Sequence, residues 1–198
     1  SSITQRPLNL SGSRAYDSTR TASGSDLIFT NIVSGETLGL TGSGVLDSPA
    51  AGSRTIVNTN TLAISDGSGI ATNYTLTNGT LTMTIVPRST TVSGTKTYDG
   101  TTNVASSNLT SFSNLAGSDT LSLSGTGTIS SADVGTGKTV NTSGLTIDNS
   151  SGVGSNYTLS AATVNVTERV IGLSGVRAFD GTNNCLLYTS PSPRDTIR

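Results

Sequence analysis

One motif recurs three times in this 198-residue chain, at intervals close to the length of a small domain. Its copies are residues 93–102 (SGTKTYDGTT), 11–18 (SGSRAYDS) and 174–181 (SGVRAFDG). The aromatic residue of the central copy, Tyr98, has its counterparts in Tyr16 and Phe179, which lie at nearly equal distances before and after it along the chain. A motif that returns at a fixed long period indicates repeated modules, each folding as a similar unit.

The sequence between the motifs repeats at one constant offset. The offset holds for pairs of different chemical type, among them Phe29/Phe112, Leu38/Leu121, Val57/Val140, Asn73/Asn156 and Tyr74/Tyr157. We therefore divide the chain into a divergent first module at residues 1–86, a second module at 87–168 and the truncated start of a third at 169–184. The joints carry no flexible Gly/Ser linker, so we expect adjoining modules to abut semi-rigidly.

Apolar residues within the modules alternate with single intervening residues. The pattern occurs at Leu121/Leu123, Leu145/Ile147, Val164/Val166, Leu38/Leu40 and Leu62/Ile64. A period of two is typical of strands that bury one face. Six or seven short strands per module, separated by Gly-, Asn- and Ser-rich turns, predict an all-β chain of tandem, small, immunoglobulin-like β-sandwiches. The alternatives are a β-grasp-like fold and a β-helical repeat, whose rungs would need a period of about twenty to thirty residues.

Every aromatic residue before position 185 occupies a repeated position. These residues are Tyr16, Tyr98 and Phe179; Phe29 and Phe112; Tyr74 and Tyr157. Such placement predicts core anchors, because each ring buries a large area in a module with few other bulky residues. A carbohydrate-binding aromatic platform is the alternative. Asn73 and Asn156 precede two of these rings, and we expect them to hydrogen-bond the backbone of a turn.

Four motifs of the second module complete the pattern. They are residues 98–102 (YDGTT), 116–121 (AGSDTL), 133–140 (DVGTGKTV) and 156–159 (NYTL). Together they resemble the YDG repeat domain, which occurs in tandem in large bacterial surface exoproteins of the filamentous-haemagglutinin-like adhesin type. The resemblance covers residues 87–168 fully and 5–86 in a divergent copy. It implies an extracellular β-module of an adhesin with no assigned catalysis. The motif residues are Tyr16 and Asp17; Tyr98, Asp99 and Gly100; Phe179, Asp180 and Gly181.

The first module departs from the central motif at Ser18, which replaces Gly100. If Gly100 supplies a positive φ in a tight turn, Ser18 must adopt that conformation at some steric cost, and we expect the fold to survive the change. Lys96 of the central motif corresponds to Arg14 in the first. Arginine cannot form an isopeptide crosslink, so this pattern indicates an ion pair or hydrogen-bond role for the cation.

The sequence offers little catalytic chemistry. It has no histidine and one cysteine, Cys185, so Ser-His-Asp and Cys-His catalysis and thiolate metal sites are excluded in their usual forms. Without an Asp-x-Asp run, the signal for calcium is weak. We predict no catalytic, cofactor-binding or metal-binding residue. The acidic residues are scattered, and we predict turn-forming or solvated side chains for Glu36, Asp47, Asp66, Asp119, Asp133 and Asp148.

Charge and hydropathy limit the partners. A formal net charge of −1 without a basic patch argues against nucleic acid, and no apolar run reaches membrane-spanning length. The chain begins at Ser1 without an initiating Met or signal peptide, which indicates a fragment. Residues 185–195 resemble a translated sequencing adaptor, so residues 185–198 are predicted to be a disordered, non-native tail. A Pro-rich linker with a free thiol is the alternative.

These observations lead to a functional hypothesis. We expect a non-enzymatic stalk module of a large secreted bacterial adhesin, which spaces or presents a binding region at the cell surface. Its partners would be neighbouring modules of the same chain. The alternative is that the modules bind host glycans or proteins through their loops. A polysaccharide-processing enzyme is a third hypothesis, and the scattered carboxylates count against it.

Overall fold

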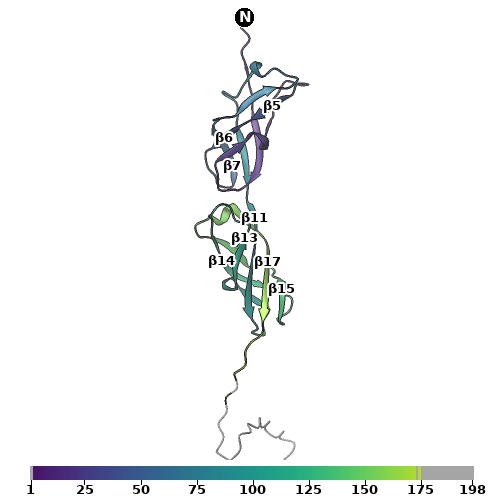
Figure 1. The fold of residues 1–198 in the computed structure, drawn as a ribbon, viewed down its shortest axis with the longest axis vertical. Coiled ribbons are helices and arrows are strands. Elements are labelled where there is room, and N and C mark those ends of the chain that lie inside the picture. The colour runs from purple at the N-terminus through teal and green to yellow at the C-terminus, as the bar shows by residue number, and fades with distance from the viewer. Residues whose placement is uncertain (1, 173, 175–198) are drawn as a thin grey trace, which may run out of the picture.

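The computed structural model describes residues 2–172 and 174, and within them it contains strands and short 3₁₀ turns but no α-helix. The strands form two modules placed end to end along the long axis of the molecule (Figure 1). The predicted all-β architecture of tandem sandwich-type modules is therefore confirmed. The predicted tail and most of the third module start, with Phe179, Asp180 and Gly181, lie outside the described residues.

The first module has ten strands and two 3₁₀ turns. They are β1 (Arg6–Pro7), β2 (Leu10–Ala15), β3 (Thr21–Ser23), η1 (Gly24–Asp26), β4 (Leu27–Phe29), β5 (Leu38–Thr41), β6 (Ser43–Leu46), β7 (Gly52–Asn58), β8 (Ala63–Asp66), η2 (Ala71–Asn73), β9 (Tyr74–Thr75) and β10 (Thr82–Val86).

The second module has seven strands and two 3₁₀ turns. They are β11 (Arg88–Thr97), β12 (Asn103–Ala105), η3 (Ser106–Asn108), β13 (Leu109–Ser113), β14 (Leu121–Thr128), β15 (Gly135–Thr139), β16 (Leu145–Asn149), η4 (Gly154–Asn156) and β17 (Tyr157–Thr167). The count exceeds the prediction only in the first module, because its counterparts of β11, β14 and β17 are each interrupted, as β1/β2, β5/β6 and β9/β10.

No sheet of the described chain contains strands of both modules. The second module has the sheets β13-β11-β17-β15 and β12-β14-β16. In the first module, pairing of β6 with β7 joins the corresponding sheets into the six-stranded order β3-β6-β7-β10-β2-β4, beside the two-stranded pairs β5-β8 and β1-β9.

The first and last long strands of each module pair in parallel. β2 pairs with β10, and β11 pairs with β17 from Arg88–Tyr157 to Thr97–Thr167. Because parallel strands run in the same direction, the chain enters each module at one end and leaves it at the other. This topology places the start of β11 directly after the end of β10 and stacks the modules end to end (Figure 1).

Each module buries its own apolar residues. The alternating pairs lie on β5, β14, β16 and β17 as predicted, with Val164 and Val166 fully buried and Leu121, Leu123, Leu145 and Ile147 half-buried. The core of the second module consists of Val92, Val104, Leu109, Ile129, Val140, Ala162, Val164 and Val166. The core of the first includes Leu10, Ala22, Leu27, Leu46, Ile56, Leu81, Met83 and Ile85, and it extends into the second module.

The Asp residue of the repeated motif closes a turn after β2 and after β11. Asp99 Oδ1 accepts hydrogen bonds from the backbone N–H and the hydroxyl of Thr101, both at 2.9 Å, and Asp17 makes the equivalent pair. Gly100 has φ of 78° and Ser18 has φ of 66°. The expected positive φ is confirmed, and Ser18 adopts it in spite of its Cβ.

The cation of the motif pairs with this Asp residue. Lys96 Nζ lies 2.8 Å from Asp99 Oδ1, and Arg14 Nη1 lies 2.5 Å from Asp17 Oδ1. Lys96 is 4% exposed and also donates to the carbonyl oxygen of Thr101 at 2.8 Å. The hydrogen bond from Lys96, together with those from Thr101, lowers the pKa of Asp99 to about 2. The predicted ion-pair role of the cation is confirmed.

Candidate functional site: the module junction

Tyr16, the aromatic residue of the first motif, lies between the two modules. It follows β2 directly, is 6% exposed, and belongs to a buried cluster that contains Ala116 and Tyr157 of the second module. The rings of Tyr16 and Tyr157 meet edge to face, with centroids 5.4 Å apart and an interplanar angle of 75°. This arrangement is the favourable one for aromatic pairs. Tyr16 is therefore an anchor shared by two modules, whereas the sequence predicted an anchor within one.

A carboxylate joins the two phenol hydroxyls. Asp119 Oδ2 accepts hydrogen bonds from Tyr157 Oη at 2.6 Å and from Tyr16 Oη at 3.2 Å, and the Ala116 N–H donates to Tyr157 Oη at 3.0 Å. Burial and the hydrogen bond to Asp119 raise the pKa of Tyr157 to about 12. Burial, followed by the charge of Asp119, also raises the pKa of Tyr16. The prediction of a turn-forming or solvated Asp119 was wrong, because both tyrosines converge on it.

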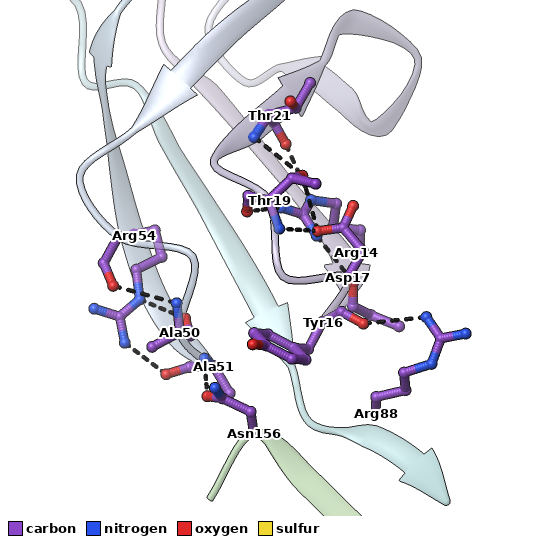
Figure 2. A network of polar contacts seen from close by, with 12 residues as sticks. Arg14, Tyr16, Asp17, Thr19, Thr21, Ala50, Ala51, Arg54, Arg88 and Asn156 are labelled. Atoms are coloured by element: carbon purple, nitrogen blue, oxygen red, sulfur yellow. Dashed lines mark hydrogen bonds and ion pairs between the residues drawn. The ribbon is translucent and has the colours of Figure 1, made fainter. Parts of the chain in front are cut away.

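A second contact joins a loop of the first module to a turn of the second. The backbone N–H of Ala51 donates to Asn156 Oδ1 at 2.9 Å, and Asn156 is 4% exposed. Arg54 braces this loop by donating to the carbonyl oxygens of Ala50 at 2.8 Å and Ala51 at 2.5 Å (Figure 2). Asn156 was expected to bond the backbone of a turn at the start of its own strand, and it instead bonds the backbone of a loop of the other module.

Arg88 fixes the joint itself. It lies at the start of β11 and donates through Nη1 to the carbonyl oxygen of Tyr16 at 3.3 Å (Figure 2). The same guanidinium donates to the carbonyl oxygen and the side chain of Asn114, at 2.8 and 2.7 Å. The Tyr16 N–H donates to the carbonyl oxygen of Val86 at 2.9 Å. These bonds leave the joint between Val86 and Arg88 little freedom to bend.

The other predicted anchors differ in their surroundings. Phe29 and Phe112 are half-buried and pack against the cores of their own modules, and Tyr74 is 4% exposed. Tyr98 is 40% exposed, so the prediction of a core anchor was wrong at this position. It follows the last residue of β11, a strand that runs away from the junction (Figure 1), and its own module covers the ring only in part.

The prediction of a turn-forming or solvated side chain was also wrong at Glu36, which accepts a hydrogen bond from the Tyr74 hydroxyl. That hydrogen bond makes the largest contribution to raising the pKa of Tyr74. Glu36 and Asp119 are the same position of the repeat, and each lies 38 residues before its tyrosine. An acidic residue repeated in register with a tyrosine was the signal that could have identified this pair.

The groups at the junction attach one module to the other. They are aromatic rings, a half-buried carboxylate and bracing hydrogen bonds, which together hold two surfaces in one geometry. Within residues 2–172 and 174, three or more His, Cys, Asp or Glu side chains do not gather into a metal-binding group. The same residues contain no helix of the length and apolarity that crossing a membrane requires.

Comparison with known families identifies both modules at once. The family model described as the YDG domain matches the chain twice, over residues 4–83 and 80–165. No curated protein and no solved structure matches the chain. The two matched segments overlap over residues 80–83 and include Tyr16, Asp119, Asn156 and Tyr157, so the junction lies between two copies of one domain.

Proposed function

The chain belongs to the YDG domain family, with two copies of the domain in tandem, and we propose that it is a non-enzymatic spacer of a secreted bacterial surface adhesin of the filamentous-haemagglutinin-like type. In this role the modules extend the molecule from the cell and present a binding region carried elsewhere in the protein. The neighbouring modules of the same chain are the principal partners of each module.

The interlocked junction is the observation that carries this proposal. The ring pair of Tyr16 and Tyr157, the Ala51–Asn156 hydrogen bond and the Arg88 bridge connect the modules at separate points. Contacts at several points around one joint resist bending in more than one direction. The parallel first and last strands add the full length of each module to the stack. A stiff unit that adds length is what a spacer needs.

The alternative is that the loops of each module bind host glycans or proteins. A glycan platform uses several exposed aromatic rings, and in the described chain Tyr16, Tyr74 and Tyr157 are buried while Tyr98 is 40% exposed. Their burial favours the spacer. Saturable binding of the full chain to a glycan array, lost on changing exposed loop residues while the fold is retained, would support the alternative instead.

The spacer function can be tested by surface display of the full chain between an outer-membrane anchor and a peptide epitope. We expect antibody binding to the epitope to exceed that of a Gly/Ser segment of the same number of residues, because the coil does not hold the epitope away from the surface. Small-angle scattering of the purified chain should give the maximum dimension of two modules end to end. Equal antibody access for both segments would contradict the spacer.

A further inference from the structure

We propose that the entry end of the first module is a preformed receptor for the motif tyrosine of another YDG module. The inference rests on the end-to-end stacking used in the proposed spacer, and it concerns a surface that stacking of these two modules leaves uncovered. The occupant is a second module of the same kind, which presents the tyrosine that follows its first long strand.

The residues of the entry end are the repeat counterparts of the residues that receive Tyr16 in the junction. All the pairs share the constant offset of the repeat, and they are Val33/Ala116, Glu36/Asp119, Asn73/Asn156 and Tyr74/Tyr157. With Ile3, Thr4, Gln5, Arg6 and Thr72, the four entry-end residues line a pocket of about 430 Å³. A cavity of about 150 Å³ already accommodates benzene, so this pocket has room for a phenol ring.

The receptor is built without an occupant. Tyr74 donates to Glu36 and accepts from the Val33 N–H at 3.4 Å, as Tyr157 donates to Asp119 and accepts from the Ala116 N–H. Two separate copies of the repeat therefore form the same hydrogen-bonded pair of carboxylate and phenol. In the junction this pair receives a further tyrosine hydroxyl at 3.2 Å.

The bracing arginine is in place as well. Arg6 donates through Nε to the carbonyl oxygen of Asn31 at 3.1 Å, which matches the bond from Arg88 Nε to Asn114. In the junction, Nη1 of Arg88 reaches the carbonyl oxygen of the incoming tyrosine. Arg6 occupies the position from which it can do the same for the tyrosine of another module.

Two of the four entry-end residues are more exposed than their counterparts in the junction, whereas Tyr74 and Tyr157 are both buried, at 4% and 5% exposed. Val33 is 43% exposed, whereas its counterpart Ala116 is 3% exposed. Asn73 is exposed, whereas Asn156 is buried and bonded to the facing module. The greater exposure of Val33 and Asn73 is what removal of a facing module would produce.

The end of the second module that is distant from the junction presents the matching insert. Tyr98 is 40% exposed, and Val134, the counterpart of Ala51, is 50% exposed. Each described end therefore carries one half of the junction, and the two halves differ. Two unlike faces associate head to tail. If the rotation from one module to the next does not close a ring, such contacts build an open array. The same geometry thus serves every joint of a longer array.

The test is a chain in which a second copy of residues 5–86 is inserted between Thr4 and Gln5 of the full sequence. We expect the backbone amide signals of Val33, Asn73 and Tyr74 in the original first module to shift relative to the unmodified chain. The added copy should tumble with the rest of the molecule in amide relaxation measurements. Tyr16→Ser in the added copy alone should return the three signals to their original positions.

Three further variants keep the result interpretable. Asn73→Ala changes an exposed side chain of the receptor and should weaken docking even if the added Tyr16→Ser copy fails to fold. The double change Val33→Ala and Glu36→Asp converts the receptor to the residues of the native junction and should preserve or increase the shifts. Tyr98→Ser lies at the other end and should leave the receptor signals unchanged.

An added copy that folds but tumbles independently, with the three signals unshifted, would overturn the proposal. Shifts that persist with Tyr16→Ser in the added copy would also overturn it, because the tyrosine would then not be the occupant. The native junction in the same molecule serves as the internal control. Independent tumbling of the two original modules would instead count against the proposed spacer.

Discussion

Tyr16 and Tyr98 occupy the same position of the repeated motif, but they differ in exposure, at 6% and 40%. Both follow a long strand and precede an Asp that closes a turn with positive φ. The difference arises outside the motif, because Tyr157 and Asp119 of the second module cover Tyr16. At the scale of the residue, the motif ring is therefore buried where a following module packs against it.

This difference predicts unequal effects of truncation at two of the repeated tyrosines. Tyr157→Ala removes a buried ring and should lower the free energy of unfolding by about 3–5 kcal/mol. Tyr98→Ala should lower it by less than about 1 kcal/mol, because the ring is partly solvated. Urea unfolding of the full chain measures both values. Similar losses for the two variants would show that Tyr98 is covered in solution.

The raised pKa of Tyr157 predicts a dependence of stability on alkaline pH. Folding holds this pKa at about 12 against an ordinary value of 10.0, so the folded chain favours the protonated phenol. The resulting stabilisation is complete below the unfolded pKa and is lost as the pH rises through the folded pKa. In an alkaline titration followed by tyrosinate absorbance, the folded chain should therefore show one tyrosine, Tyr157, that ionises at a higher pH than an ordinary tyrosine.

Replacement of the facing carboxylate tests the cause. Asp119→Asn removes the anion and should let Tyr157 ionise at lower pH than in the unmodified chain. Asp26→Asn changes an exposed carboxylate in η1 and should leave the late titration in place. An unchanged titration in Asp119→Asn would mean that burial alone raises the pKa.

At the scale of the element, the glycine at the second position of the repeated motif, Gly94 in the second module and Gly12 in the first, permits close packing of a strand and a turn. A Cβ on Gly94 would lie 1.7 Å from the carbonyl oxygen of Asn108, and one on Gly12 would lie 2.0 Å from that of Asp26. The register of β11 against β13 shifts at Gly94, where Asn108, the last residue of η3, lies against the strand. Any side chain at this position would push the two segments apart.

Gly94→Ala should consequently destabilise the second module. We expect a loss of about 1–3 kcal/mol or more, as for other overpacked sites, because the clash involves backbone on both sides. Gly172→Ala is the matched control, since a Cβ there meets no atom within 4 Å. Thermal unfolding followed by circular dichroism compares the variants. Equal midpoints would show that η3 moves away at little cost.

At the scale of the whole molecule, the core of the first module continues across the joint. The cluster that contains Leu10 and Ile85 also includes Ala116 and Tyr157, while the second module keeps a separate core. The first module therefore depends on its neighbour more than the second depends on the first. Coupling of this kind makes the unfolding of stacked repeats partly cooperative.

Asn156→Ala should reduce this coupling. It leaves the partly buried N–H of Ala51 without its acceptor, which costs about 1–3 kcal/mol. Calorimetry should show the transition of the first module move to lower temperature and separate from that of the second. Asn165→Ala is the control, because Asn165 Oδ1 accepts from the Gly137 N–H at 2.7 Å within one module. Separation of the transitions in the control as well would exclude a role specific to the junction.

The sequence by itself determined the repeat, the β character and the local chemistry of the motif. Two tandem modules, the alternating strands, the positive φ at Gly100 and Ser18 and the ion pair of Lys96 all followed from short segments or from their recurrence. These features depend on neighbours in sequence, which a linear pattern records. The interruptions of the strands in the first module were not predicted, because the two copies share the same alternation.

Only the tertiary structure decided which rings anchor a core and which join modules. Tyr16 meets Asp119 across 103 residues, and Asn156 meets Ala51 across 105. Such contacts depend on how two folded surfaces stack, and the residues involved carry the same local sequence whether or not they are covered. The motif tyrosine could therefore be recognised from the sequence, whereas its place in the junction required the fold of the module that follows it.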